Sequence, residues 1–276
     1  MTMDETSAAA PSGELARPRR RGVWIVLAVL TAVAVVVPSG LRLSVQAIRR
    51  TSTAVTPYQH AIKEVRLDMA QANVSVAPGP AGEARVYKRL SWAVTEPRVD
   101  EQLVGDVLYV TFRCADPEDS LSGLGCDGDI DVQVPPGARV SAVSRVGRID
   151  VRGLTGDLDL RTGSGRIGLA DVRGRVRVRA RSGEIAATGL ASPEILAQVS
   201  SGRLDLRCAE PPGSVEATAG SGAVRLIVPP GSRYRVVGWT GSGTAHLNRA
   251  LADDRSERRL SVYSDSGSTY VDYRDD

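Results

Sequence analysis

The sequence has few aromatic residues, which make up 4% of its 276 positions and include a single phenylalanine. Proteins that bind bases or sugars commonly stack them on aromatic side chains, so this scarcity argues against such platforms. Lysine is also scarce, because Lys63 and Lys88 are the only lysines among 35 basic residues. The formal net charge of +3 is small for this length, so the overall charge gives no case for nucleic-acid binding. We expect no nucleic-acid partner.

Glycine, in contrast, is common, with 28 residues. Many glycines and few large rings suit a thin, repetitive β core better than a globule packed around aromatic side chains. The length allows one large β domain or two ordinary domains.

A short unit recurs from residue 143 onward: a glycine followed by four residues in which apolar side chains alternate with others. The first marker glycines are spaced by about nine residues, the length of a short strand with its turn. Two units make a coil of about 18–20 residues, which predicts an all-β fold of the parallel β-solenoid or β-helix type. A β-sandwich, whose turns recur at a similar spacing, is the alternative. The marker glycines of the regular part are Gly147, Gly156, Gly165, Gly174 and Gly183.

This repeat predicts which residues stack on one another from coil to coil. One inner ladder is expected to contain Ile149, Ile167, Ile185, Leu204 and Val224, and the facing ladder Leu158, Val176, Ile195 and Val215. Opposite charges should follow each other on the outside, as in Asp157, Arg175 and Glu194 or in Arg166, Glu184 and Arg203. Residues 260–273 would form the final coil. The spacing of the repeat loosens after Gly183.

Five arginines occupy alternate positions in the stretch DVRGRVRVRARSG. A strand would place all of them on one side and the intervening apolar residues on the other. We interpret them as a solvated strand face, partly neutralised by Asp157 and Asp159 on the neighbouring strand. A polyanion-binding stripe is the alternative function for the same residues. This candidate stripe consists of Arg173, Arg175, Arg177, Arg179 and Arg181.

The N-terminal part contains a run without charge from residue 22 to residue 41, preceded by four arginines. Twenty such residues are about the length of a membrane span, and the flanking charge favours a cytoplasmic N-terminus. We expect a disordered cytoplasmic tail at 1–21, a transmembrane helix at 22–41, a stalk at 42–59 and a β-strand-repeat ectodomain at 60–273. The predicted location is the bacterial cell membrane, with a single pass and an extracytoplasmic C-terminal domain. A cleaved signal peptide is the alternative.

Three cysteines are present, and two of them flank a loop rich in Gly, Ser and Asp. A structural disulfide between Cys114 and Cys126 is predicted, and it would stabilise the fold by about 3 kcal/mol in the loop-entropy model. Two unpaired thiols are the alternative. Cys208, at the end of a strand pattern, is expected to be a small buried filler and not a nucleophile.

The sequence offers no catalytic constellation. The prominent carboxylates alternate with apolar residues, as on surface strands, and do not suggest two acids converging across a cleft. An aspartate cluster begins like a calcium loop but lacks the downstream glutamate, and the two histidines have no evident partner. We expect no catalytic residue, no cofactor and no metal. The residues considered were Asp150, Asp157, Asp159, Asp171 and Asp205, the calcium candidates Asp127, Asp129 and Asp131, and His60 and His246.

The order of motifs resembles the bacterial "putative adhesin" family over residues 60–273. The segments LSWAVTEP, VLYVTFRC and DIDVQVPPG come first, and Ser-Gly units with alternating apolar residues follow. The resemblance implies a β-strand-repeat domain of unknown function, common in membrane-anchored proteins of GC-rich bacteria, without a defined ligand or catalytic residue.

We therefore expect a noncatalytic, membrane-anchored extracytoplasmic adhesin or interaction scaffold. Its partner, apart from the membrane, would be a cell-wall polymer, another protein or another copy. The alternatives are a carbohydrate-active β-helix enzyme and a module that binds polyanions such as a cell-wall polymer. A cytosolic polymerising scaffold of the bactofilin type is a variant of the first reading.

Overall fold

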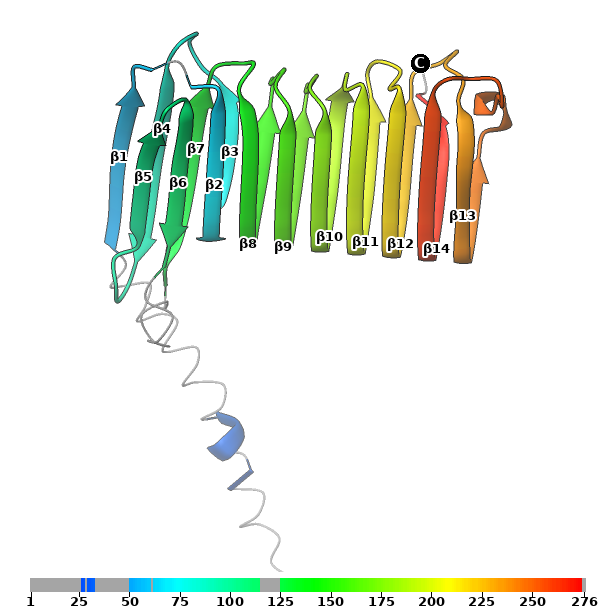
Figure 1. Cartoon of the computed structure of the whole chain (residues 1–276). Coiled ribbons are helices and arrows are strands. Elements are labelled where there is room, and N and C mark those ends of the chain that lie inside the picture. Colours follow the sequence, from blue (N-terminus) through cyan, green and yellow to red (C-terminus); the bar gives the residue numbers. More distant parts are fainter. Residues whose placement is uncertain (1–25, 28, 33–49, 61, 115–124, 275–276) are drawn as a thin grey trace, which may run out of the picture. The chain divides into compact units, whose positions relative to one another are not determined.

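The computed structural model describes residues 26–27, 29–32, 50–60, 62–114 and 125–274. The chain divides into two units, Met1–Ala47 and Ile48–Asp276. In the first unit, residues 26–27 and 29–32 are helical. The second unit consists of β-strands and one short 3-10 helix, and Figure 1 shows its strands side by side along a row. Its elements are β1 (Arg50–Tyr58), β2 (Glu64–Gln71), β3 (Asn73–Pro78), β4 (Ala84–Trp92), β5 (Arg98–Val104), β6 (Val107–Arg113), β7 (Asp127–Val134), β8 (Arg139–Arg152), β9 (Leu158–Ala170), β10 (Val176–Leu190), β11 (Glu194–Cys208), β12 (Ser214–Val228), β13 (Arg235–Leu247), η1 (Arg249–Leu251) and β14 (Arg259–Tyr273).

The described residues do not contain the transmembrane helix predicted at 22–41. A span needs about 20 consecutive, mainly apolar residues in one helix. Among the residues that the structure describes, no helix reaches the length and hydropathy that a bilayer crossing requires. This finding corrects the predicted membrane partnership and the predicted single-pass location in the cell membrane. The rest of the range 22–41, together with the predicted tail at 1–21, lies outside the described residues.

The predicted parallel β-solenoid is also wrong, because the strands form one mixed sheet of 14 strands. Near the N-terminal end of the unit, β4 pairs antiparallel with both β1 and β7, and β5 pairs antiparallel with β6. The antiparallel pairing of β5 with β6 follows from the length of their connection, since only Gly105 and Asp106 join the two strands. So short a loop can only join antiparallel neighbours, because a parallel pair needs a long crossover. The β1 strand lies within the range 42–59 that was expected to be a stalk.

From β8 to β12 the strands pair in parallel, and here the predicted stacking is confirmed. Ile167 pairs with Ile149 on one side and with Ile185 on the other. The ladder continues through Leu204 to Val224, and the facing ladder from Leu158 to Val215 is in register as well. The three isoleucines are fully buried. In Figure 1 each of these strands folds back on itself, so that its two halves lie in two layers. The buried apolar side chains of these strands belong to one core.

A glycine forms the corner at which each long strand turns from one layer to the other. Gly183 has φ +132°, a conformation that side chains rarely tolerate, and its neighbours in the ladder share it. A Cβ atom on Gly183 would lie 1.9 Å from the carbonyl oxygen of Gly165. The stacked corners therefore leave no room for any residue except glycine.

The order of the last strands departs from the sequence order. Residues of β14 pair with β12, and β13 pairs only with β14, so that β13 is the edge of the sheet. Residues 260–273 do belong to the last strand of the chain, β14, but this strand lies between β12 and β13 and is not the end of the stack. The connection between β13 and β14 contains η1 and the buried Leu251.

Candidate functional site

The predicted arginine stripe lies on one outer face, but most of its members already have protein partners. Along β10, the exposed or half-buried arginines alternate with buried apolar residues, as the sequence indicated. Exposed ion pairs, such as those that Arg173 and Arg175 form, contribute about 0–1 kcal/mol each to stability, so they hold the side chains only loosely. The contacts are Arg173 Nη1–Glu210 Oε1 at 2.9 Å, Arg175 Nε–Glu194 Oε2 at 3.7 Å and Arg179 Nε–Gln198 Oε1 at 2.9 Å.

The cross-strand charge pairing is confirmed in part. The side chain of Asp157 accepts a hydrogen bond from the backbone N–H of Arg175 at 3.0 Å. Arg166 and Glu184 form an ion pair at 3.6 Å. Arg177 lies opposite Asp159 in the register, but the ion pair that Asp159 makes at 2.9 Å is with Arg161 of its own strand.

A shallow hollow of about 580 Å³ lies on the outer face of the sheet, and Asp157, Asp159, Arg175 and Arg177 are among the residues that line it. It runs across a row in which acid and base alternate from strand to strand: Glu64, Arg139, Asp157, Arg175 and Glu194. Arg139 approaches Asp157 to 3.9 Å, which continues the alternation. Because the charges in this row are matched, the hollow has no strong preference for an anion.

A second hollow of about 370 Å³ on the same face has a different electrostatic character. Four guanidinium groups come to it from β6, β8, β9 and β10, and one carboxylate is among the lining residues. We call it the arginine pocket; its charged residues are Arg113, Arg145, Arg161, Arg181 and Asp68.

The floor of the arginine pocket depends on Gly163. Ser144, Thr162 and Ala180 pair in register on three adjacent strands, so the residues after them occupy equivalent positions. Those residues are Arg145, Gly163 and Arg181. A Cβ atom on Gly163 would lie 2.6 Å from the carbonyl oxygen of Arg145, so no side chain fills the gap between the two arginines.

The positive charge of this pocket is poorly neutralised by the protein. Arg113, Arg145 and Arg181 are exposed and take part in none of the ion pairs that the described residues form. Arg161 lies directly opposite Arg179 on the next strand, and like charges at that position destabilise a sheet. Guanidinium groups donate forked hydrogen bonds that match carboxylate and phosphate oxygens. The chemistry of Arg113, Arg145 and Arg181 therefore suits an anionic group.

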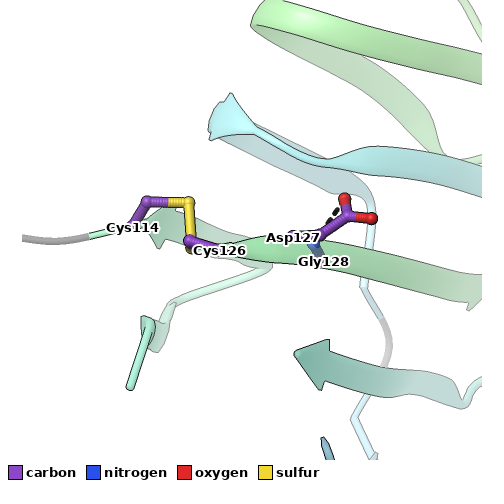
Figure 2. The surroundings of a disulfide bond; sticks show 4 residues. All are labelled: Cys114, Cys126, Asp127 and Gly128. Atoms are coloured by element: carbon purple, nitrogen blue, oxygen red, sulfur yellow. Dashed lines mark hydrogen bonds between the residues drawn. A yellow bond between two sulfur atoms is a disulfide. The ribbon is translucent and has the colours of Figure 1, made fainter. Parts of the chain in front are cut away.

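The predicted disulfide between Cys114 and Cys126 is confirmed. Figure 2 shows it beside Asp127 and Gly128, where the side chain of Asp127 accepts a hydrogen bond from the backbone N–H of Gly128 at 3.0 Å. The bridge connects the end of β6 to the start of β7, two strands that are not hydrogen-bonded to each other. The single phenylalanine, Phe112, is buried next to it, against the face that Gly128 leaves open. The enclosed residues 115–124 lie outside the described part of the chain.

The other residues considered as a possible nucleophile or as metal ligands do not form a site together. Cys208 is buried, and burial raises the pKa of its thiol to about 12, so it remains protonated and a poor nucleophile. The calcium candidate Asp129 accepts a hydrogen bond from Asn73 at 3.0 Å. Within the described residues, no three side chains of His, Cys, Asp or Glu are grouped closely enough to hold a metal ion.

The expectation that the histidines are isolated is wrong. His246 stacks on Tyr270 with ring centroids 4.6 Å apart, and its Nε2 lies 3.4 Å from Asp272. Hydrogen bonds from Asn248 and Tyr270 hold the pKa of Asp272 at about 2. These residues share the outer face of β13 and β14, a proximity that the sequence did not indicate. His60 lies 3.9 Å from Asp106.

Comparison with protein families finds no matching family, and no curated protein matches the chain. Among solved structures, a "putative cell adhesion protein" from Clostridium sporogenes is 6% identical, with a TM-score of 0.39, and the match covers 82% of this chain and 100% of that one. A "putative adhesin" from Bacteroides fragilis is 10% identical, with a TM-score of 0.40 and coverages of 81% and 97%. A "putative lipid binding protein" from Parabacteroides distasonis is 11% identical, with a TM-score of 0.37 and coverages of 82% and 97%.

Similarities of this size are too weak to transfer a ligand or a function to the chain. The arginine pocket must therefore be interpreted from its own chemistry.

Proposed function

We propose that this chain is a noncatalytic, adhesin-like surface protein that binds an extended anionic polymer, and that the arginine pocket is the main contact. The observation that carries the proposal is the group of exposed guanidiniums without ion pairs around Gly163. A polymer is favoured over a small ligand because the pocket is an open hollow on a strand face and is not an enclosed cavity. The polymer's phosphate or carboxylate groups would occupy the pocket, with the flanking charge ladder beside it.

The test compares two double variants of the full chain on a heparin column eluted with a salt gradient. Arg145→Gln with Arg181→Gln removes two unpaired charges from the arginine pocket. Arg175→Gln with Arg177→Gln is the matched control, because it removes the same charge from the same face, at the row where Arg175 already pairs with Glu194. We expect the pocket variant to elute at clearly lower salt and the control variant to elute close to the wild-type protein.

Three outcomes would contradict this proposal. If the control variant loses as much retention as the pocket variant, the binding depends on diffuse charge or on the stripe 173–181. If neither variant changes retention, the anion binds elsewhere. If incubation with the protein shortens a soluble anionic polysaccharide, as measured by gel filtration of the polymer, the noncatalytic part of the proposal is wrong.

A further inference from the structure

The strand β13 forms an edge of the sheet, because β14 is its only partner among the described strands. Along its length from Arg235 to Leu247 it pairs with β14, and no other described strand pairs with it. One side of this strand therefore presents a row of backbone N–H and C=O groups that are free to pair with another strand.

The apolar core between the two layers is also open at β13. Val236 pairs with Leu260, which is 1% exposed, yet Val236 itself is only half-buried. Leu247 pairs with the buried Val271 but is 39% exposed. The last inward-facing side chains of the core thus lie in contact with solvent.

The strands at the other end of the sheet carry features that prevent pairing with a further strand, and β13 lacks these features. The edge strand β1 contains Pro57, which has no N–H to donate, and β5 contains Arg98, Asp100 and Glu101. Proline and charged residues are the usual means by which proteins prevent edge-to-edge pairing. In β13, no charged residue occurs between Arg235 and His246. The described part of β13 thus combines a long uncharged stretch that contains no proline with inward-facing side chains that solvent reaches.

We propose that β13 pairs with β13 of a second copy of this chain around a two-fold axis. The strand reverses direction at Gly243, where φ is +140°, and Figure 1 shows its two halves in the two layers. A two-fold axis parallel to the strands places the first half of one copy beside the second half of the other. Both halves then meet an antiparallel partner, and the contact is self-complementary, as two-fold symmetry requires.

A second copy fits this edge better than a foreign strand does. One extended peptide would pair with a single layer and leave the other edge and the core open. The two-fold copy completes both layers at once and buries Val236 and Leu247 of both chains against each other. Because the strand is uncharged over most of its length, no charge has to be removed from water at the contact.

A head-to-tail contact with β1 is less suitable, because β1 pairs antiparallel with β4 and has no Ser-Gly corner to continue the glycine stack.

The experiment measures the mass of the full chain by light scattering after size-exclusion chromatography over a range of concentrations. We expect wild-type dimers that dissociate on dilution. Val237→Lys places a charge on the unpaired edge at a side chain that is 66% exposed, so the fold should tolerate it while the dimer is lost. Val55→Lys is the matched control on β1, where the side chain is 56% exposed, and it should leave the dimer unchanged.

A second measurement locates the contact. Ser242→Cys, at the corner of β13, should form a disulfide-linked dimer under mild oxidation, since the two corners lie beside the axis. Ser266→Cys, its partner in the adjacent strand, lies farther from the axis and should not. A wild-type protein that stays monomeric at every concentration would overturn the proposal. Equal dimerisation of Val237→Lys and the wild type, or equal cross-linking of the two cysteine variants, would also overturn it.

Discussion

Replacing Gly183 by alanine tests how much the tight packing of the stacked glycine corners contributes to the stability of the fold. An alanine at this position must adopt φ +132°, which costs about 1–3 kcal/mol for a residue with a side chain. Its Cβ would also lie 1.9 Å from the carbonyl oxygen of Gly165, and relieving such overpacking costs about 1–3 kcal/mol more. The oxygen belongs to backbone inside a ladder that is paired on both sides, so it cannot move aside easily. We expect a loss of about 2–6 kcal/mol in the free energy of unfolding.

Gly231→Ala separates the two contributions. Gly231 also has a positive φ, +76°, but a Cβ there would meet no atom within 4 Å. This variant should therefore lose only about 1–2 kcal/mol, from the strained backbone alone. The gain that alanine brings by restricting the unfolded chain is similar for both substitutions and cancels in the comparison.

Urea denaturation of both variants, followed by circular dichroism, gives the two free energies of unfolding. If Gly183→Ala and Gly231→Ala are equally destabilised, the corner is not tightly packed and our account of the glycine stack is wrong. A large loss in Gly183→Ala with an unchanged dependence on urea concentration would support it.

Two further predictions concern burial and pH. Ile167→Asp should cost several kcal/mol in urea denaturation because it places a carboxylate in the fully buried core, whereas Arg166→Asp on the outer face should cost under about 1 kcal/mol; similar losses would contradict the assigned faces. Asp272, whose pKa is lowered to about 2 in the folded protein, stabilises the fold above the pKa of an unfolded aspartate, and this contribution is lost as the pH falls toward 2. In Asp272→Asn, the melting temperature should fall less as the pH is lowered over this range. An equal fall in the variant and the wild type would show that other carboxylates cause the acid sensitivity.

The stacking of residues could be predicted because it depends on local pattern. A glycine every half coil and alternating apolar residues determine which side chains face the core, and a slip of one residue would turn Ile167 and its neighbours outward. The pairing of Cys114 with Cys126 was predictable for a similar reason, since the two flank one short loop. The spacing also continued to determine the register past Gly183, where the sequence repeat itself had loosened.

The arginine pocket was not found from the sequence, although a signal for it exists there. Reading the arginines along one strand drew attention to the stretch 171–183, whose members are largely paired. Reading them across strands, at the predicted coil spacing, would have placed Arg145 and Arg181 on either side of Gly163. Some partners of the arginines come from other strands, as Glu194 does for Arg175, so only the assembled face shows which arginines lack an ion pair.

The sequence by itself determined the short alternating strands, their inward and outward faces and the glycine corners, because these follow from backbone sterics and from a period of two. It did not determine the direction of the N-terminal strands or the position of β13 outside β14. Strand direction depends on how each connection crosses the sheet, and sheet order depends on which strand best covers the open core. Both are decided by the free energy of the whole packed sheet, so no local pattern in the sequence specifies them.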